Sequence, residues 1–252
     1  MIKTEHLSKF FGNKEAVRDL NLEIPAGELF AFIGPNGAGK STTIKMLVGL
    51  LLPTGGDAII GGYNIRDNPV EAKRLIGYIP DFPYLYEKLT GREFMRFIGR
   101  IYDLPPIEMN SSIEYYLDVF GLLNLSEDLI KNYSHGYRQR LVLASALLHN
   151  PQVLIIDEPM VGLDPRTSRL IKDLLKELCR EGVTVFMSTH TLSVAEEIAD
   201  RVGIIHEGEL IACGSLDELR QGSGVDGRLE DVFLHLTEEE YEDGRDEKVI
   251  SA

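Results

Sequence analysis

The sequence predicts an α/β fold with a mixed, largely parallel sheet, an antiparallel β part at the N-terminus and an inserted helical subdomain. Short apolar runs that suit buried strands alternate with amphipathic helical stretches along most of the chain. Weakly alternating segments precede the first buried run, as expected for half-exposed antiparallel strands. In the middle of the chain, roughly 60 residues show helical patterns without an intervening strand. The length of 252 residues is enough to bury a full core.

The individual elements follow from hydrophobic periodicity and from turn residues. Thr90 with Glu93 three residues later forms a capping box that opens a helix, and Pro105 and Pro106 end that helix. The expected strands are 2–7, 16–24, 29–33, 58–60, 76–80, 153–156, 183–188, 202–205 and 210–212. The expected helices are 40–51, 71–76, 90–102, 113–123, 134–148, 167–181, one capped by Ser193 with Glu196, 215–220 and 229–236, and turns are expected at 10–14 and 221–224.

A glycine-rich loop joins the buried strand at 29–33 to the helix that starts at Lys40. It has the form G-x-x-x-x-G-K-[ST], and strand, loop and helix together are the context of a phosphate-binding P-loop. Its glycines let backbone N–H groups curl around an anion, and the helix directs its positive end to the same place. Lys40 adds a charge for phosphates and Ser41 a hydroxyl ligand for Mg²⁺. The loop consists of Gly34, Pro35, Asn36, Gly37, Ala38, Gly39, Lys40, Ser41 and Thr42. The fold class is therefore a P-loop NTPase core.

Two carboxylates, Asp157 and Glu158, follow directly after the buried strand at 153–156. In an open α/β sheet, ligands bind at the carboxyl ends of the strands. One carboxylate can hold a phosphate-bound Mg²⁺, and the other can orient and polarise a water molecule. A solvated acidic turn is the alternative interpretation, and the phosphate loop argues against it.

Further candidates lie near the same edge of the sheet. His190 follows the strand at 183–188 and can hydrogen-bond a γ-phosphate and an attacking water, although a histidine there is more often structural. Phe10 or Phe11 can stack on adenine, with core packing as the alternative for either one.

Composition excludes some partners. The formal net charge of −14 argues against nucleic acid, because affinity for phosphate backbones comes largely from Lys and Arg. Part of this charge belongs to an acidic C-terminal tail at 237–252. Cys179 and Cys213 form no metal-binding spacing and are expected to be buried thiols. No apolar run is long enough to span a bilayer, so any work at a membrane requires a partner.

The order of these motifs resembles that of an ATP-binding-cassette (ABC) ATPase over residues 2–236. In this resemblance Gly34–Ser41 is the Walker A loop, and Val153–Glu158 is Walker B with the catalytic glutamate. Gly162–Asp164 is similar to the D-loop, His190 falls at the switch histidine, and Phe11 falls at the adenine-stacking aromatic. The resemblance implies one ATPase domain at 1–236 with a helical subdomain inserted at about 87–150.

Two segments match the family pattern imperfectly. Residues 133–137 lie at the signature motif, which usually reads L-S-G-G-Q; Ser134 and Gly136, the positions that meet the γ-phosphate, are present. His135 and Tyr137 depart from that pattern. Asp81 stands where the Q-loop glutamine is expected. A carboxylate there can bind Mg²⁺, but it adds negative charge near the γ-phosphate.

The resemblance implies an enzyme that binds ATP and Mg²⁺ and hydrolyses ATP in a head-to-tail dimer, in which each nucleotide meets the second subunit's signature. Asp164 is then expected to contact the interface between the subunits. The segments around Asp81, 89–94 and 229–233 are similar to ATPase subunits of bacterial exporters of the drug, antibiotic or polysaccharide type. A separate transmembrane permease subunit is therefore expected, with this chain in the cytoplasm on the inner face of the membrane. The alternatives are a soluble ABC ATPase that acts as an ATP-gated clamp or regulatory module, and a P-loop kinase.

Overall fold

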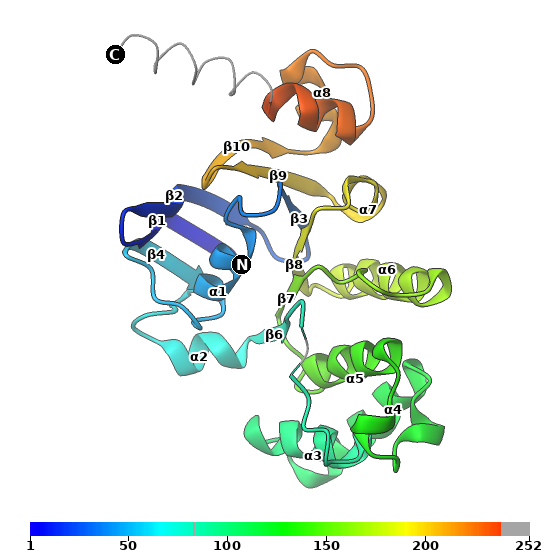
Figure 1. Cartoon of the computed structure of the whole chain (residues 1–252). Helices are drawn as coiled ribbons and strands as arrows, with labels where there is room; N and C mark the ends of the chain where they lie inside the picture. Colours follow the sequence, from blue (N-terminus) through cyan, green and yellow to red (C-terminus); the bar gives the residue numbers. More distant parts are fainter. Residues whose placement is uncertain (83, 238–252) are drawn as a thin grey trace.

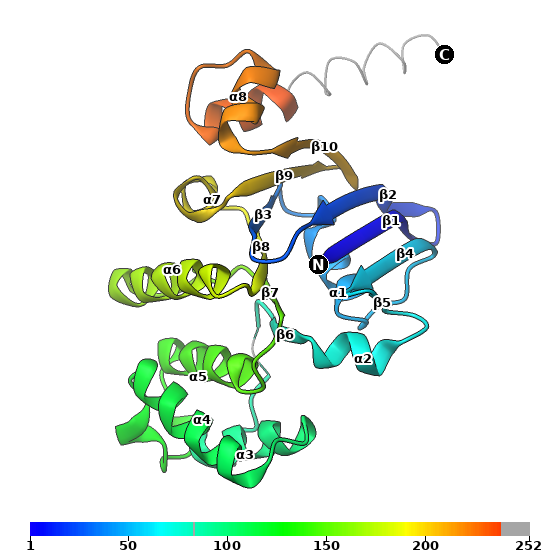
Figure 2. The ribbon, with the colours of Figure 1, turned by 180° about the vertical axis from the view of Figure 1, so that it is seen from behind.

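The computed structural model describes residues 1–82 and 84–237, and these residues form two β-sheets flanked by helices (Figures 1 and 2). Within them, an antiparallel four-stranded sheet has the order β2-β1-β4-β5, and a six-stranded sheet has the order β10-β9-β3-β8-β7-β6. The second sheet is parallel except for β10, which pairs antiparallel with β9. The strands are β1 (Ile2–Phe11), β2 (Lys14–Ile24), β3 (Leu29–Ile33), β4 (Gly55–Ile60), β5 (Tyr63–Asn64), β6 (Ile76–Ile79), β7 (Val153–Asp157), β8 (Thr184–Thr189), β9 (Arg201–His206) and β10 (Glu209–Gly214).

The helices lie between and around the sheets. α1 contacts β2 and β4 of one sheet and β7 of the other, so it fills the space between them. α3 and α4 lie on the far side of α5 from the sheets (Figures 1 and 2). The helices are α1 (Lys40–Leu47), α2 (Pro69–Arg74), α3 (Gly91–Ile101), α4 (Pro106–Val119), α5 (His135–Leu147), α6 (Pro165–Arg180), α7 (Leu192–Ile198) and α8 (Leu216–Ser223), with short 3₁₀ turns at Leu123–Leu125 and Ile130–Asn132 and a further helical stretch at 229–237.

β3 lies between β9 and β8 in the six-stranded sheet, and both of its faces are buried. Leu29, Ala31 and Ile33 pack with α5–α7 in one apolar cluster, and Phe30 and Phe32 pack with α1 and the antiparallel sheet in the other. This division follows from the period of two along a strand. The strand is therefore held rigidly where the glycine-rich loop leaves its C-terminal end.

The expected α/β architecture is confirmed, and most strands lie where periodicity placed them. α3–α5 fall within the range predicted for the inserted helical subdomain; the division into domains stays a prediction. The capping box at Thr90 is present, with Glu93 N donating to the Thr90 hydroxyl over 3.2 Å and Thr90 N donating to Glu93 Oε2 over 2.9 Å.

Several element boundaries differ from the predictions for local reasons. The turn expected at 10–14 is shorter, because Gly12 at φ 59° allows a tight hairpin that keeps Phe10 and Phe11 in β1. Pro106 begins α4 at its first position instead of only ending α3. Gly49 at φ 66° follows the early end of α1. The smaller differences are that α7 is capped at Thr191 instead of Ser193, that α8 continues to Ser223 through the expected turn at 221–224, and that β5 was not predicted.

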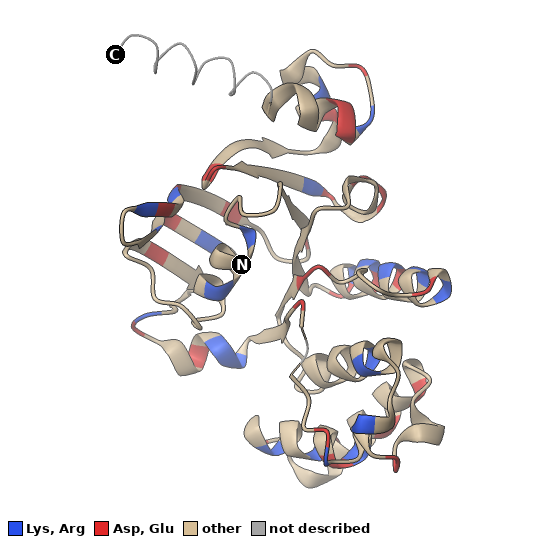
Figure 3. Cartoon of the chain, in the orientation of Figure 1, with Lys and Arg blue, Asp and Glu red and all other residues tan. Residues whose placement is uncertain are grey.

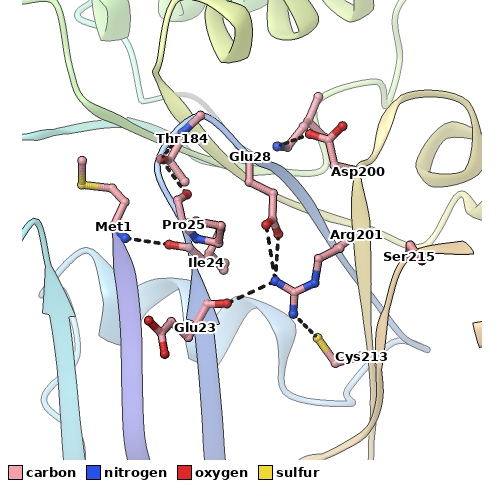
Figure 4. A network of polar contacts seen from close by, with 12 residues as sticks. Met1, Glu23, Ile24, Pro25, Glu28, Thr184, Asp200, Arg201, Cys213 and Ser215 are labelled. Atoms are coloured by element: carbon pink, nitrogen blue, oxygen red, sulfur yellow. Dashed lines mark hydrogen bonds and ion pairs between the residues drawn. The ribbon is translucent and has the colours of Figure 1, made fainter. Parts of the chain in front are cut away.

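A polar network holds the end of the large sheet that lies opposite the glycine-rich loop (Figure 4). Arg201 at the start of β9 donates to Glu28 Oε1 over 3.2 Å and to Cys213 Sγ over 3.3 Å. The backbone N–H of Leu29 donates to Asp200 over 2.8 Å. Cys213 is exposed, so the expectation of a buried thiol is wrong for this residue, while Cys179 is partly buried. The network fixes β3, β9 and β10 relative to one another.

His149 follows α5, where the ends of α3 and α5 meet the start of β6. Its ring stacks on Tyr102 with centroids 3.6 Å apart, and its Nε2 donates to the Ile76 carbonyl over 3.1 Å. Its Nδ1 is buried without a partner. Burial lowers the pKa of His149 from 6.5 to about 4, opposed by the Ile76 hydrogen bond. The native ring is therefore neutral, and protonation favours the unfolded chain.

We expect His149→Phe to reduce the acid sensitivity of the fold. The unfolded chain takes up this proton below pH 6.5 and the native chain only near pH 4, so the wild type loses stability as pH falls between these values, by about 2–3 kcal/mol at pH 4.5. Phe keeps the stack on Tyr102 and removes the titration. Urea unfolding at pH 7.5 and 4.5 measures the difference, and an equal loss for both proteins would contradict the assignment.

Among the described residues, no helix combines the length and the apolar character needed to cross a bilayer. The acidic tail predicted at 237–252 lies, apart from Thr237, outside the described residues.

Candidate functional site

The glycine-rich loop lies at the C-terminal end of β3, between that strand and α1. Gly37 has φ 85° and Gly39, at the N-cap of α1, has φ 117°, conformations that side chains with a Cβ rarely adopt. A Cβ on Gly39 would also lie 2.6 Å from the Ala16 carbonyl oxygen. The loop therefore requires glycine at these positions, and its shape leaves the N-terminal end of α1 free to face an anion.

Lys40 is 7% exposed although it begins a helix. Its Nζ donates to the Gly34 carbonyl over 2.6 Å and to the Pro35 carbonyl over 3.0 Å, so the ammonium group is held over the loop. Burial lowers the pKa of Lys40, and the negative charges of Glu158 and Asp157 oppose that shift. The site thus holds one cation opposite a pair of carboxylates.

Asp157 ends β7 and is 6% exposed. It is paired in register with Ser188 of β8, whose hydroxyl donates to Asp157 Oδ1. The buried carboxylate is therefore fixed by a neighbouring strand. Ser188 was not predicted as a site residue, and the signal that identifies it is its place one strand away at the same level of the sheet.

Glu158 follows Asp157 with φ 53°, a left-handed conformation that is uncommon for a residue with a side chain. Its Oε1 accepts hydrogen bonds from the His190 backbone N–H over 3.0 Å and pairs with His190 Nδ1 at 2.7 Å. Thr189, which was also not predicted, donates to Oε2 over 3.2 Å. Two neighbouring residues thus hold the carboxylate through three groups, and the structure brings Glu158 and His190 together.

Asp81 joins this group from the segment after β6. Partial burial raises the pKa of Asp81, and the charges of Asp157 and Glu158 raise it further, while His190 lowers it. The same environment raises the pKa of Tyr78 to about 12, mainly through burial. The carboxylates of Asp81, Asp157 and Glu158 therefore face one region from which water is partly excluded.

Residues of the glycine-rich loop and the carboxylates of Asp81, Asp157 and Glu158 line one pocket of about 340 Å³. Phe11, 51% exposed, forms its outer wall, next to Lys14 and Ala16 of β2, which were not predicted. The complete lining is Phe11, Lys14, Ala16, Asn36, Gly37, Gly39, Lys40, Ser41, Thr42, Asp81, Asp157 and Glu158. Pro35 and Ala38 face a neighbouring hollow on the outer side of the loop.

His190 and Gly34 are also absent from this lining, and the remaining predicted site residues, Ser134, Gly136 and Asp164, lie away from the pocket. Ser134 caps α5, where its hydroxyl accepts from Tyr137 N over 3.4 Å, and Gly136 lies in the first turn of that helix. Asp164 caps α6, where its Oδ1 accepts from the backbone N–H groups of Arg166 and Thr167 over 3.0 Å each. The chain therefore does not bring its own signature and D-loop segments to its own phosphate loop.

The donor set of the pocket suits a hard cation bound together with phosphates. Within the described part of the chain, no three acidic, histidine or cysteine residues are grouped to hold a metal by themselves. Mg²⁺ uses one or two carboxylates and substrate phosphate oxygens instead of a closed protein cage. The Ser41 hydroxyl and the Asp157 and Asp81 carboxylates, which all line the pocket, fit that requirement.

Comparison with known proteins supports the resemblance to ABC ATPases. The family model described as ABC transporter matches residues 17–161. The Linearmycin resistance ATP-binding protein LnrL of Bacillus subtilis (strain 168) is 38% identical over 226 residues, which cover 90% of this chain and 73% of LnrL.

Solved structures agree with the fold. An ATP binding subunit of an ABC transporter superimposes with a TM-score of 0.89 and 34% identity, covering 94% of this chain and 99% of that structure. The ATP-binding cassette MJ0796, solved as a dimer in a post-hydrolysis state bound to ADP and Pi, gives 0.79 and 28%, covering 86% and 99%. With its glycine-rich loop, its paired carboxylates and these relatives, the chain belongs to the ABC transporter family as one of its ATPases.

Proposed function

We propose that this chain is the ATP-hydrolysing subunit of a transporter that exports its substrate through a separate transmembrane subunit. The observation that carries the proposal is that Lys40 lies in one pocket with Asp157 and Glu158. The link of LnrL to linearmycin resistance supports export. The soluble clamp, considered as an alternative from the sequence, gains no support from these relatives.

The pocket residues divide the work on ATP. Backbone N–H groups of the loop and Lys40 bind the β- and γ-phosphates, and Phe11 stacks on the adenine. Ser41, Asp157 and Asp81 would hold Mg²⁺, and the bound ion would supply positive charge against the phosphates. Ser188 keeps Asp157 in the orientation for this role.

Glu158 polarises the attacking water, and His190 holds that water against the γ-phosphate. The left-handed backbone of Glu158 and its hydrogen bonds to Thr189 and His190 fix the carboxylate in place. Fixed orientation matters because in-line attack on a phosphoryl group depends mainly on positioning and charge.

A second copy of the chain completes each site. Ser134 and Gly136 lie away from the pocket of their own chain, as expected if they contact ATP held by a head-to-tail partner. Ser134 caps a helix whose N-terminal end suits an anion. The dimeric state of MJ0796 supports this arrangement.

Asp81→Gln is expected to speed turnover by about fivefold, because its amide oxygen can still bind Mg²⁺ while a charge worth about 1 kcal/mol beside the γ-phosphate is removed. Asp81→Glu keeps the charge and serves as the control. Phosphate release measured across a range of Mg²⁺ concentrations checks the prediction. Slower turnover of the glutamine variant, restored by high Mg²⁺, would instead show that metal binding at this position requires the carboxylate and not only an amide oxygen.

The membrane partner docks on exposed apolar side chains of α3 and of the segment between β6 and α3. Tyr84 is 94% exposed and Phe82 74%, and Ile101 of α3 is 58% exposed. Tyr86, also exposed, lies against Phe97 of α3 with ring centroids 5.3 Å apart. We define Phe82, Tyr84, Tyr86, Phe97 and Ile101 as the α3 surface. Apolar surface of this kind marks a site of protein contact.

Charge argues against nucleic acid as the partner. The net charge is −14, and basic and acidic residues are interspersed along α6 in Figure 3. We place the protein in the cytoplasm, on the inner face of the membrane, where ATP and the partner subunit meet.

Co-purification tests the proposal. The tagged chain is extracted from membranes of its own host in mild detergent, and its companions are identified by mass spectrometry. We expect a membrane protein with several spans in roughly equal amount. If only cytosolic proteins co-purify, the transport function is contradicted, and the assignment of the nucleotide site is unaffected.

A further inference from the structure

Of the two residues that depart from the common signature pattern, His135 lies against the D-loop of its own chain and Tyr137 is linked to it through Arg140. A Cβ built on Gly162 would lie 3.0 Å from His135 Nε2 and 3.2 Å from its Cδ2, so the imidazole ring covers Gly162. Gly162 has φ 73°, a left-handed conformation that disfavours any residue with a side chain at this position. His135 therefore bridges the start of α5 and the segment that leads into α6.

Tyr137 reaches the same segment through Arg140. The guanidinium carbon of Arg140 lies 5.3 Å from the centre of the Tyr137 ring. The same guanidinium donates to the Thr167 hydroxyl and lies 3.8 Å from Asp164 Oδ2. Thr167 is 1% exposed and donates to Asp164 Oδ2 over 2.6 Å. Asp164 is thus held from both α5 and α6.

We propose that His135 is a positioning residue that fixes the signature segment to the D-loop of the same chain. The inference rests on the proposed head-to-tail dimer. There, Ser134 and Gly136 contact the ATP of the partner, and Asp164 lies at the interface. Because His135 stands between these two groups, engagement of the partner's ATP by the signature also places Asp164. Glycine at position 135 would lack a side chain for this contact, and Arg140 would then be the remaining link described above between α5 and Asp164.

The first test measures the contact without nucleotide or dimer. Hydrogen exchange of the 161–164 amides is followed in wild type, His135→Ala and His135→Gln, with Lys131→Ala as a control for an exposed side chain just before the signature. We expect faster exchange by about fivefold in the alanine variant and a return toward wild type in the glutamine variant, whose planar amide restores part of the contact. Unchanged exchange in His135→Ala would overturn the contact.

The second test measures its consequence for ATP hydrolysis. For His135→Ala we expect kcat to fall about fivefold and the Hill coefficient for ATP to fall toward one, with half-saturation changed less than about twofold, because Ser134 and Gly136 remain. His135→Gln should recover most of both. Wild-type values in the alanine variant, or weaker half-saturation alone, would overturn the role. Failure of the wild type to hydrolyse ATP would instead refute the proposed function, and the exchange result would still stand.

Discussion

Glu158→Gln is expected to slow ATP hydrolysis by about 10²- to 10⁴-fold, the range that a positioned general base contributes. The amide keeps an oxygen that can accept from the His190 N–H, so the surrounding hydrogen bonds and the fold survive. ATP binding survives because the phosphates are held by Lys40 and the loop. Phosphate release and the binding of a fluorescent ATP analogue measure the two effects separately.

Glu207→Gln is the matched control for this substitution. Glu207 is also a glutamate in the left-handed region, at φ 43°, after a strand of the same sheet. It lies outside the pocket that holds Glu158, and its amide variant should turn over like the wild type. Wild-type turnover by Glu158→Gln would show that another residue activates the water.

Ile101→Glu and Tyr84→Glu are expected to lower capture of the membrane subunit by more than about tenfold, because each places an unpaired charge in an apolar interface. Both positions belong to the α3 surface and are exposed in the isolated chain, so folding should be unaffected. Co-purification from host membranes, quantified against the bait, measures the loss, and thermal unfolding confirms the fold.

Tyr115→Glu is the control for position. Tyr115 is 63% exposed on α4, an aromatic of similar exposure in the same helical region. It should leave capture unchanged. Equal losses for Tyr115→Glu and the α3 variants would show that added negative charge, and not a defined surface, reduces binding.

The sequence alone predicted those parts of the site that are local in the chain. The loop at Gly34–Thr42 could be recognised because strand, glycines, lysine and helix follow one another directly. The carboxylates at Asp157 and Glu158 could be recognised because a fully buried strand ends at them. Both patterns are set by neighbouring residues, and the structure places both in one pocket.

The remaining parts depend on pairing between distant segments. Ser188 is a site residue because the pairing of β7 with β8 sets it opposite Asp157. The sequence of neither strand alone predicts that register. Lys14 reaches the pocket because the hairpin turn at Gly12 is tighter than predicted. The left-handed backbone of Glu158 accompanies its hydrogen bonds to Thr189 and His190, and no local sequence pattern predicts it. Proline at 106 was misjudged because it can both end one helix and begin the next.

The measurement that tests the account most directly is the molar mass of Glu158→Gln by light scattering, with and without Mg²⁺ and ATP. The account predicts single chains of 28.2 kDa without nucleotide and a complex of twice that mass with ATP, because each pocket needs the signature of a second chain. Ser134→Glu in the same background should abolish the ATP-dependent dimer by setting a carboxylate against the γ-phosphate. A protein that binds ATP tightly and stays a single chain at high concentration would contradict the shared site.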